Sequence, residues 1–126
     1  MWIASTLGFY SIVEKPKKGV YQIRTRQRKD LENLMLAAEL DESIDNAGGT
    51  DYQFRIYVQQ DKLLKIMKIL AESIEYPNFK SEVEKIPDQR DKLNGYNNLW
   101  ADLFQVALDI PRRFINPSGY KKIRKI

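Results

Sequence analysis

The sequence predicts an α+β fold in which an antiparallel sheet of three to four strands packs against amphipathic helices. Residues 9–14 and 20–27 are rich in β-branched and aromatic side chains and flank a proline–glycine turn, which is typical of a hairpin. Residues 51–59 alternate apolar and polar side chains, as a strand with one buried face does. Residues 31–38 and 63–74 repeat apolar side chains at helical spacing. These patterns predict helices on one face of the sheet.

Length and composition favour one soluble domain. The 126 residues suffice for a single core, and a content of 43% hydrophobic and 30% charged residues is typical of folded soluble chains. No apolar run approaches the ~20 residues of a membrane span, and Met1–Ala4 is too short for a signal peptide. We expect a cytoplasmic protein in which residues 1–110 form a single α+β ligand-binding domain. Residues 111–126 are expected to be a basic C-terminal tail or arm.

The chain contains neither histidine nor cysteine. The usual general base at neutral pH and the commonest transition-metal ligand are therefore missing, as are thiolate zinc sites and cysteine nucleophiles. Carboxylate pairs such as Glu82 with Glu84 and Asp88 with Asp91 are explained by a helix surface and a helix cap. No glycine-rich phosphate loop or nucleophile motif is present. We predict a protein that is not an enzyme and uses no cofactor or metal.

Residues 20–28 carry the most informative pattern in the chain. In an extended strand, one side carries Tyr21, Ile23 and Thr25, and the other carries Gln22 followed by Arg24, Arg26 and Arg28. Planar guanidinium groups bind phosphate better than the point charge of lysine does. The alternative is an ordinary solvated face. The pattern predicts either an anion-binding strand face or a hydrated one.

The strand at 51–59 is predicted to extend this surface. One face carries Tyr52, Phe54, Ile56 and Val58 and is expected to be core, whereas the other carries Gln53, Arg55 and Tyr57. If this strand pairs with the hairpin, Arg24, Arg26, Arg55 and Tyr57 line one surface. Such a surface would combine phosphate-binding forks with an aromatic ring.

The expected helices start at aspartates, which are good N-caps. Asp30 would cap a helix over 31–38, and Asp61 a helix to about residue 74. A short helical piece ends near Lys85, and Asp88 would cap a long final helix. The acidic segment 41–50 is predicted to be a solvated loop, because it lacks the glycine and glutamate that a calcium loop needs.

The final helix is predicted to carry an apolar stripe that serves as core or as a subunit interface. The stripe repeats at helical spacing and consists of Leu93, Tyr96, Trp100, Leu103, Phe104 and Ala107.

Charge is distributed unevenly along the chain. Residues 1–28 carry a net +5, residues 29–110 a net −7 and residues 111–126 a net +6. This distribution favours a local anion site over a uniformly basic surface. The amino end of the first helix adds a partial positive charge beside the arginine strand. With the Phe79–Lys80 turn, these residues favour the binding of a nucleotide-like anion.

Several blocks of the sequence resemble a known protein family. They are MWIASTLGFYSIVEKP at 1–16, IRTRQRKDLENL at 23–34, DYQFRIYV at 51–58 and IEYPNFK at 74–80. Together they resemble the phage anti-Thoeris signal-sequestering proteins over about residues 1–110. Members of that family hold a cyclic ADP-ribose isomer, made by a TIR-domain defence enzyme, without cleaving it. Some also hold cyclic di- or trinucleotides at separate sites in a higher oligomer.

The resemblance implies ligand contacts from arginines and one aromatic ring. The positions that fit are Arg28, Arg55 and Phe79, followed by Asn94 and by Arg112 or Arg113. It also implies a homo-oligomer, either a dimer or a trimer of dimers, in the cytoplasm of the host cell. The long basic tail departs from the family pattern, which leaves its role in ligand closure or assembly open.

We therefore predict non-catalytic sequestration of a cyclic nucleotide immune signal. In this hypothesis Arg24, Arg26 and Arg28 engage pyrophosphate, Arg55 assists, and Phe79 or Tyr57 stacks on adenine beside Lys80. One alternative is a small RNA- or DNA-binding module that uses the tail and the arginine strand. Its affinity would fall steeply with salt. Another is an assembly protein whose arginines bind an acidic partner.

Overall fold

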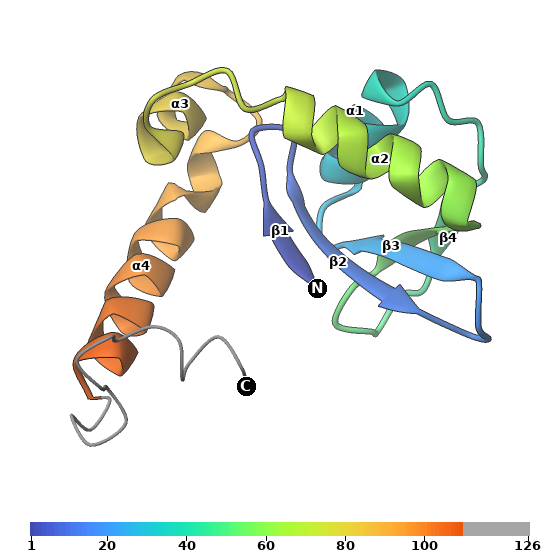
Figure 1. The fold of residues 1–126 in the computed structure, drawn as a ribbon, viewed down its shortest axis with the longest axis horizontal. Helices are drawn as coiled ribbons and strands as arrows, with labels where there is room; N and C mark the ends of the chain where they lie inside the picture. Colours follow the sequence, from blue (N-terminus) through green and yellow to red (C-terminus); the bar gives the residue numbers. More distant parts are fainter. Residues whose placement is uncertain (110–126) are drawn as a thin grey trace, which may run out of the picture. The chain divides into compact units, whose positions relative to one another are not determined.

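The computed structural model describes residues 1–109, which form five strands and four helices (Figure 1). Two compact units are present, one from Met1 to Asp91 and one that begins at Lys92. The first unit contains, in order, β1 (Trp2–Ala4), β2 (Phe9–Glu14), β3 (Tyr21–Thr25), α1 (Arg28–Ala37), β4 (Asp45–Asn46), β5 (Phe54–Val58), α2 (Gln60–Glu72) and α3 (Phe79–Lys85). A 3₁₀ turn, Arg90–Lys92, leads into α4 (Leu93–Leu108).

The five strands form one antiparallel sheet in the order β1-β2-β3-β5-β4. The predicted hairpin is confirmed as β2 and β3, and its turn ends at Gly19, whose φ of +86° suits glycine. The predicted pairing of the 51–59 strand with the hairpin is also confirmed, as β5 beside β3. The sheet has five strands rather than three or four, because two residues of the expected acidic loop form β4. A two-residue strand shows no alternation in sequence.

The apolar face of the sheet builds the core. Ile12, Ile23 and Ile56 are register partners on neighbouring strands and are almost fully buried. Helices α1 and α2 lie on this face (Figure 1). They contribute the buried side chains Leu31, Leu34, Ala38, Ile66 and Leu70. The opposite face of the sheet carries the alternate residues of each strand, including the arginines.

Three predicted N-caps are wrong. Helix α1 begins at Arg28 with Gln27 as N-cap, and α2 begins at Gln60 with Gln59 as N-cap. Asp30 and Asp61 lie inside the first turns of these helices, where a negative charge still complements the helix dipole. The long final helix starts at Leu93 and not after Asp88, because a 3₁₀ turn intervenes. The predicted short helix is confirmed as α3, which is capped by the side chain of Asn78.

Asp30 is buried and joins three segments of the first unit. Its carboxylate accepts hydrogen bonds from the backbone N–H of Phe9 at 3.1 Å and from the side-chain amide of Gln89 at 2.8 Å. Its backbone carbonyl accepts the hydroxyl of Tyr10 at 2.7 Å. These bonds explain why the carboxylate is not a cap: it points to the start of β2 and to the segment after α3.

We expect Gly8→Ala to destabilise the first unit, because its backbone packs directly on this junction. A Cβ at Gly8 would lie 2.5 Å from Cβ of Asp30 and 2.8 Å from the hydroxyl oxygen of Tyr10. Overpacking of this kind costs about 1–3 kcal/mol of unfolding free energy. Gly48→Ala is the matched control, since its nearest neighbouring atom would be 3.9 Å away. Urea denaturation should show a lower midpoint for Gly8→Ala alone; equal midpoints would contradict this packing.

Helix α4 exposes a broad apolar surface. Six large side chains are between 37% and 63% exposed: Leu99, Trp100, Leu103, Phe104, Val106 and Leu108. The rings of Trp100 and Phe104 stack with their centroids 5.5 Å apart. Most of the predicted stripe is thus not covered within the described part of the chain. No helix within residues 1–109 is long and apolar enough to cross a membrane.

Candidate functional site

A row of side chains crosses the open face of the sheet, with one residue from each strand. In the strand register, each of these residues is the direct partner of the next one on the neighbouring strand. Register partners in antiparallel strands point to the same face, about 4.5–5.5 Å apart. We call this set the arginine row: Trp2, Ser11, Arg24, Arg55 and Asp45.

Arg24 and Arg55 are direct cross-strand partners in the arginine row. Like charges directly opposite each other destabilise a sheet pair. Within residues 1–109, neither arginine forms an ion pair. The centre of the row therefore holds two adjacent positive charges without an ion pair in the described chain, and the carboxylate of Asp45 follows Arg55 at the end of the row.

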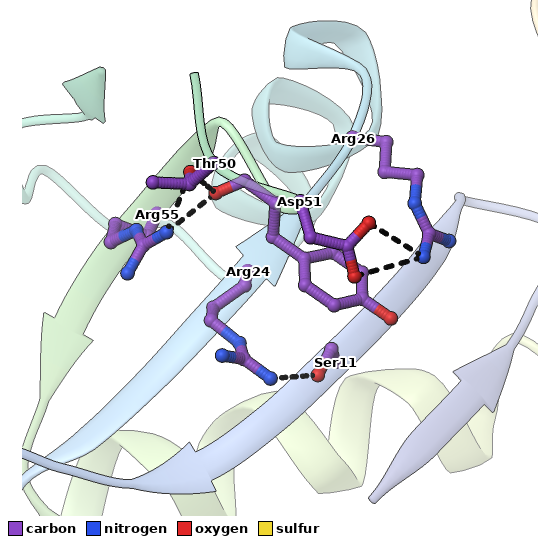
Figure 2. Close-up of polar contacts among 7 residues, drawn as sticks. Ser11, Arg24, Arg26, Thr50, Asp51 and Arg55 are labelled. Carbon is purple, nitrogen blue, oxygen red and sulfur yellow. Dashed lines mark hydrogen bonds and ion pairs between the residues drawn. The ribbon is translucent and has the colours of Figure 1, made fainter. Parts of the chain in front are cut away.

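Neutral acceptors position both guanidinium groups (Figure 2). Nη2 of Arg24 donates to Oγ of Ser11 at 2.6 Å, which turns this guanidinium toward β2. Nη1 of Arg55 donates to Oε1 of Gln22 at 3.1 Å, and Nη2 donates to the carbonyl of Tyr52 at 2.6 Å and to Oγ1 of Thr50 at 3.2 Å. These bonds fix the orientation of the groups and leave their charges uncancelled.

Tyr52 lies on the arginine side, so its predicted place in the core face is wrong. Strand β5 begins at Phe54, and the alternation therefore does not extend back to Tyr52. The Tyr52 ring is buried and lies under two guanidinium groups, 4.7 Å from Cζ of Arg24 and 4.4 Å from Cζ of Arg26. Cation–π attraction accounts for this packing.

Three buried donors of this cluster have no hydrogen-bond partner within residues 1–109. They are Nε of Arg24, Nε of Arg55 and the hydroxyl of Tyr52. A buried donor without a partner costs about 1–3 kcal/mol, so such groups are uncommon in folded proteins. All three lie around the arginine row, below its accessible surface.

Arg26 and Arg28 differ from this central pair, because each is paired with a carboxylate. Arg26 contacts Asp51 at 3.2 Å, as Figure 2 shows, and Arg28 contacts Glu32 one helical turn away at 3.6 Å. Both side chains are about half exposed. The predicted place of Arg28 on the strand face is wrong, because β3 ends at Thr25 and Arg28 begins α1.

The other predicted site residues are dispersed. Tyr57 is on the arginine face, 40% exposed, and its hydroxyl donates to Asp45 at 3.3 Å. Phe79 and Lys80 begin α3, where the Phe79 ring lies 5.9 Å from that of Tyr76. Asn94 is exposed on α4, in the second unit. Arg112 and Arg113 lie outside the described residues.

Sequence reasoning missed Trp2, Ser11 and Tyr52. Only the register shows that Trp2 and Ser11 share a row with the arginines. Two local signals were available: residues 1–5 can form a short strand with Trp2 and Ala4 on one side, and the alternation of residues 9–14 places Ser11 on the face opposite to its neighbours. The position of Tyr52 depends on the turn before β5, which no local pattern encodes.

Two hollows of about 290 and 240 Å³ lie between the sheet and α2, and the lining of the larger one includes Trp2 of the arginine row. Met1 and Met67 contribute to both, and their linings are mainly apolar. Neither lining includes a predicted site residue. Trp2 is thus the one member of the arginine row that lines either hollow.

No protein-family model, curated protein or solved structure matches this chain.

Proposed function

We propose that this protein binds a cyclic nucleotide immune signal, a cyclic ADP-ribose isomer, and sequesters it without cleaving it, thereby countering TIR-based anti-phage defence. The observation that carries the proposal is the Arg24–Arg55 pair, two cations side by side on a strand face, neither of which forms an ion pair within residues 1–109. A pyrophosphate offers two linked anionic centres and can accept hydrogen bonds from both guanidinium groups. Binding would relieve the repulsion between the two arginines.

Arg26 and Arg28 take a secondary part in this proposal. Each would have to exchange a carboxylate partner for a phosphate, which reduces the net gain. Arg24 and Arg55 have no carboxylate to exchange, because their hydrogen bonds within the described chain go to neutral acceptors. The pyrophosphate is therefore expected between the central pair, with Arg26 and Arg28 at its periphery.

The composition of the chain favours sequestration over cleavage in this proposal. Without histidine or cysteine, the chain lacks the side chains that most often act as a general base or nucleophile near neutral pH. Fixed arginines can hold a pyrophosphate, but a guanidinium stays protonated and cannot accept a proton from water. Binding is thus the chemistry that the arginine row supports.

Isothermal titration with a cyclic ADP-ribose isomer tests the proposal. We expect saturable heat, a modest dependence on salt, and release of intact nucleotide after denaturation, identified by mass spectrometry. Absence of heat or release of a hydrolysed product would contradict the proposal. If instead the protein binds RNA or DNA with an affinity that falls steeply with salt, the alternative of a nucleic-acid-binding module is correct.

We further propose that a second copy of the chain covers α4. The six exposed apolar side chains of α4 present on the order of 700 Å² to solvent, close to the ~800 Å² that each partner buries in a standard-size interface. Between Leu93 and Leu108 the only charged residue is Asp102, so two copies of this helix would repel each other little. A dimer is the expected unit, and a trimer of dimers would be built from it.

Replacing Leu103 and Phe104 by glutamate should convert the oligomer to monomer. The change places four carboxylates in the apolar interface of a dimer, where unpaired charges are strongly unfavourable. Analytical ultracentrifugation would measure the mass of both proteins. Gln105→Glu, an exposed polar position on the same helix, is the control and should keep the wild-type mass. A monomeric wild-type protein would contradict the interface.

A further inference from the structure

Trp2 is a large exposed aromatic side chain at one end of the arginine row. It is 66% exposed, and its ring contacts Phe9 at a centroid distance of 6.1 Å with a tilt of 58°. Strands in a sheet lie about 4.7–4.9 Å apart, so the β1 backbone at Trp2 is ~10 Å from the β3 backbone at Arg24. The indole therefore offers an exposed ring surface two strands away from Arg24, the nearer arginine of the central pair.

We propose that Trp2 is the base-stacking residue of the nucleotide site, an inference that rests on the proposed function. The hydrogen bond from Arg24 to Ser11 turns the guanidinium toward β2, and β1 is the next strand in that direction. A phosphate held by Arg24 thus lies on the Trp2 side of the row. A base extending from that phosphate along the row reaches the indole face, and stacking on such rings is favourable for every base.

The opposite end of the row is less suited to this role. There the row ends in Asp45, whose carboxylate repels a phosphate-bearing ligand. The nearest ring, that of Tyr57, is held by a hydrogen bond from its hydroxyl to Asp45. The ligand is therefore expected to lie with its phosphates over Arg24 and Arg55 and its base over Trp2.

Fluorescence of a single-tryptophan protein tests the contact directly. The chain has two tryptophans, and Trp100→Phe leaves Trp2 as the only tryptophan, whose emission can be excited selectively. We expect a cyclic ADP-ribose isomer to quench Trp2 emission with saturation, whereas inorganic pyrophosphate, which has no base, should bind with little quenching. Binding of the nucleotide by calorimetry with no change in Trp2 emission would overturn the inference and leave the proposed function intact.

Affinity measurements separate stacking from phosphate binding. Trp2→Ala should weaken binding of the nucleotide about 10- to 100-fold and leave pyrophosphate affinity unchanged. Trp2→Leu keeps an apolar contact for Phe9 and should show the same loss, which excludes a folding defect. If Tyr57→Ala or Phe79→Ala weakens nucleotide binding and Trp2→Ala does not, the base stacks elsewhere and the inference is wrong. If the wild-type protein binds neither probe, the proposed function fails as well.

Discussion

Replacing Arg24 and Arg55 together by glutamine should lower the affinity for a cyclic ADP-ribose isomer by about 10²- to 10⁴-fold. A hydrogen bond to a charged group contributes about 1.5–3 kcal/mol, so losing one from each arginine removes about 3–6 kcal/mol. Neither guanidinium group forms an ion pair within residues 1–109, so the phosphates would not have to displace a carboxylate from either one. Isothermal titration at fixed salt measures the loss.

Arg26→Gln with Arg28→Gln is the matched control, because it removes the same formal charge from the same region. Both arginines are already paired with carboxylates, and we expect a loss of less than about fivefold. Circular dichroism should confirm that each double variant is folded, since Arg55 also holds Thr50 and the carbonyl of Tyr52. Equal losses in the two double variants would mean that net charge, rather than the central pair, determines binding.

Replacing one arginine by lysine separates charge from geometry. Arg24→Lys keeps the positive charge but loses the planar fork that can bind phosphate through two parallel hydrogen bonds. We therefore expect this variant to bind more weakly than wild type and more tightly than Arg24→Gln. If lysine restores wild-type affinity, a diffuse electrostatic attraction suffices and the fixed orientation through Ser11 has no role.

The central pair was predictable because it depends on a local property. Side chains two apart in a strand share a face, so the alternation around Arg24 and Arg55 was sufficient to place each on a polar face. The predicted pairing of the two strands then brought them together. The fold class followed from the same period-two and helical patterns, and only the two-residue strand β4 was too short to show one.

The rest of the site depends on register and on turns, which the sequence does not specify locally. Trp2 joins the row only because it pairs with Ser11 rather than with a neighbour one residue away. A slip of one residue would move its side chain to the core face. Tyr52 lies among the arginines because the chain turns before β5, and the ion pair of Arg26 with Asp51 spans 25 residues.

The start of α1 was mispredicted for a related reason. An aspartate before an apolar stripe is a typical N-cap, but its carboxylate can instead accept hydrogen bonds from buried donors elsewhere in the chain. The backbone of Phe9 and the side chain of Gln89 both donate to Asp30, and Gln89 is 59 residues away. These two hydrogen bonds outweigh an N-cap, which contributes only about 1 kcal/mol.

Asp30→Ala should therefore have the largest effect on stability in the first unit, about 3–5 kcal/mol of unfolding free energy. The substitution removes an acceptor from the partly buried backbone N–H of Phe9 and from the buried amide of Gln89, at about 1–3 kcal/mol for each. It also opens a small cavity beside Gly8. Thermal unfolding followed by circular dichroism should show a melting temperature lower by on the order of 10 °C.

Asp88→Ala tests whether this loss is specific to the buried carboxylate. Asp88 accepts a hydrogen bond from the same amide of Gln89, at 3.2 Å, but it is only partly buried. Water can replace it, so we expect a loss below about 1 kcal/mol. The carboxylate of Asp30 has no such replacement, because its side chain is 1% exposed and lies between β2, α1 and the segment after α3. If both variants melted together, Asp30 would be a dispensable polar group rather than the junction that fixes α1, and with it the start of β2, against the sheet that carries the arginines.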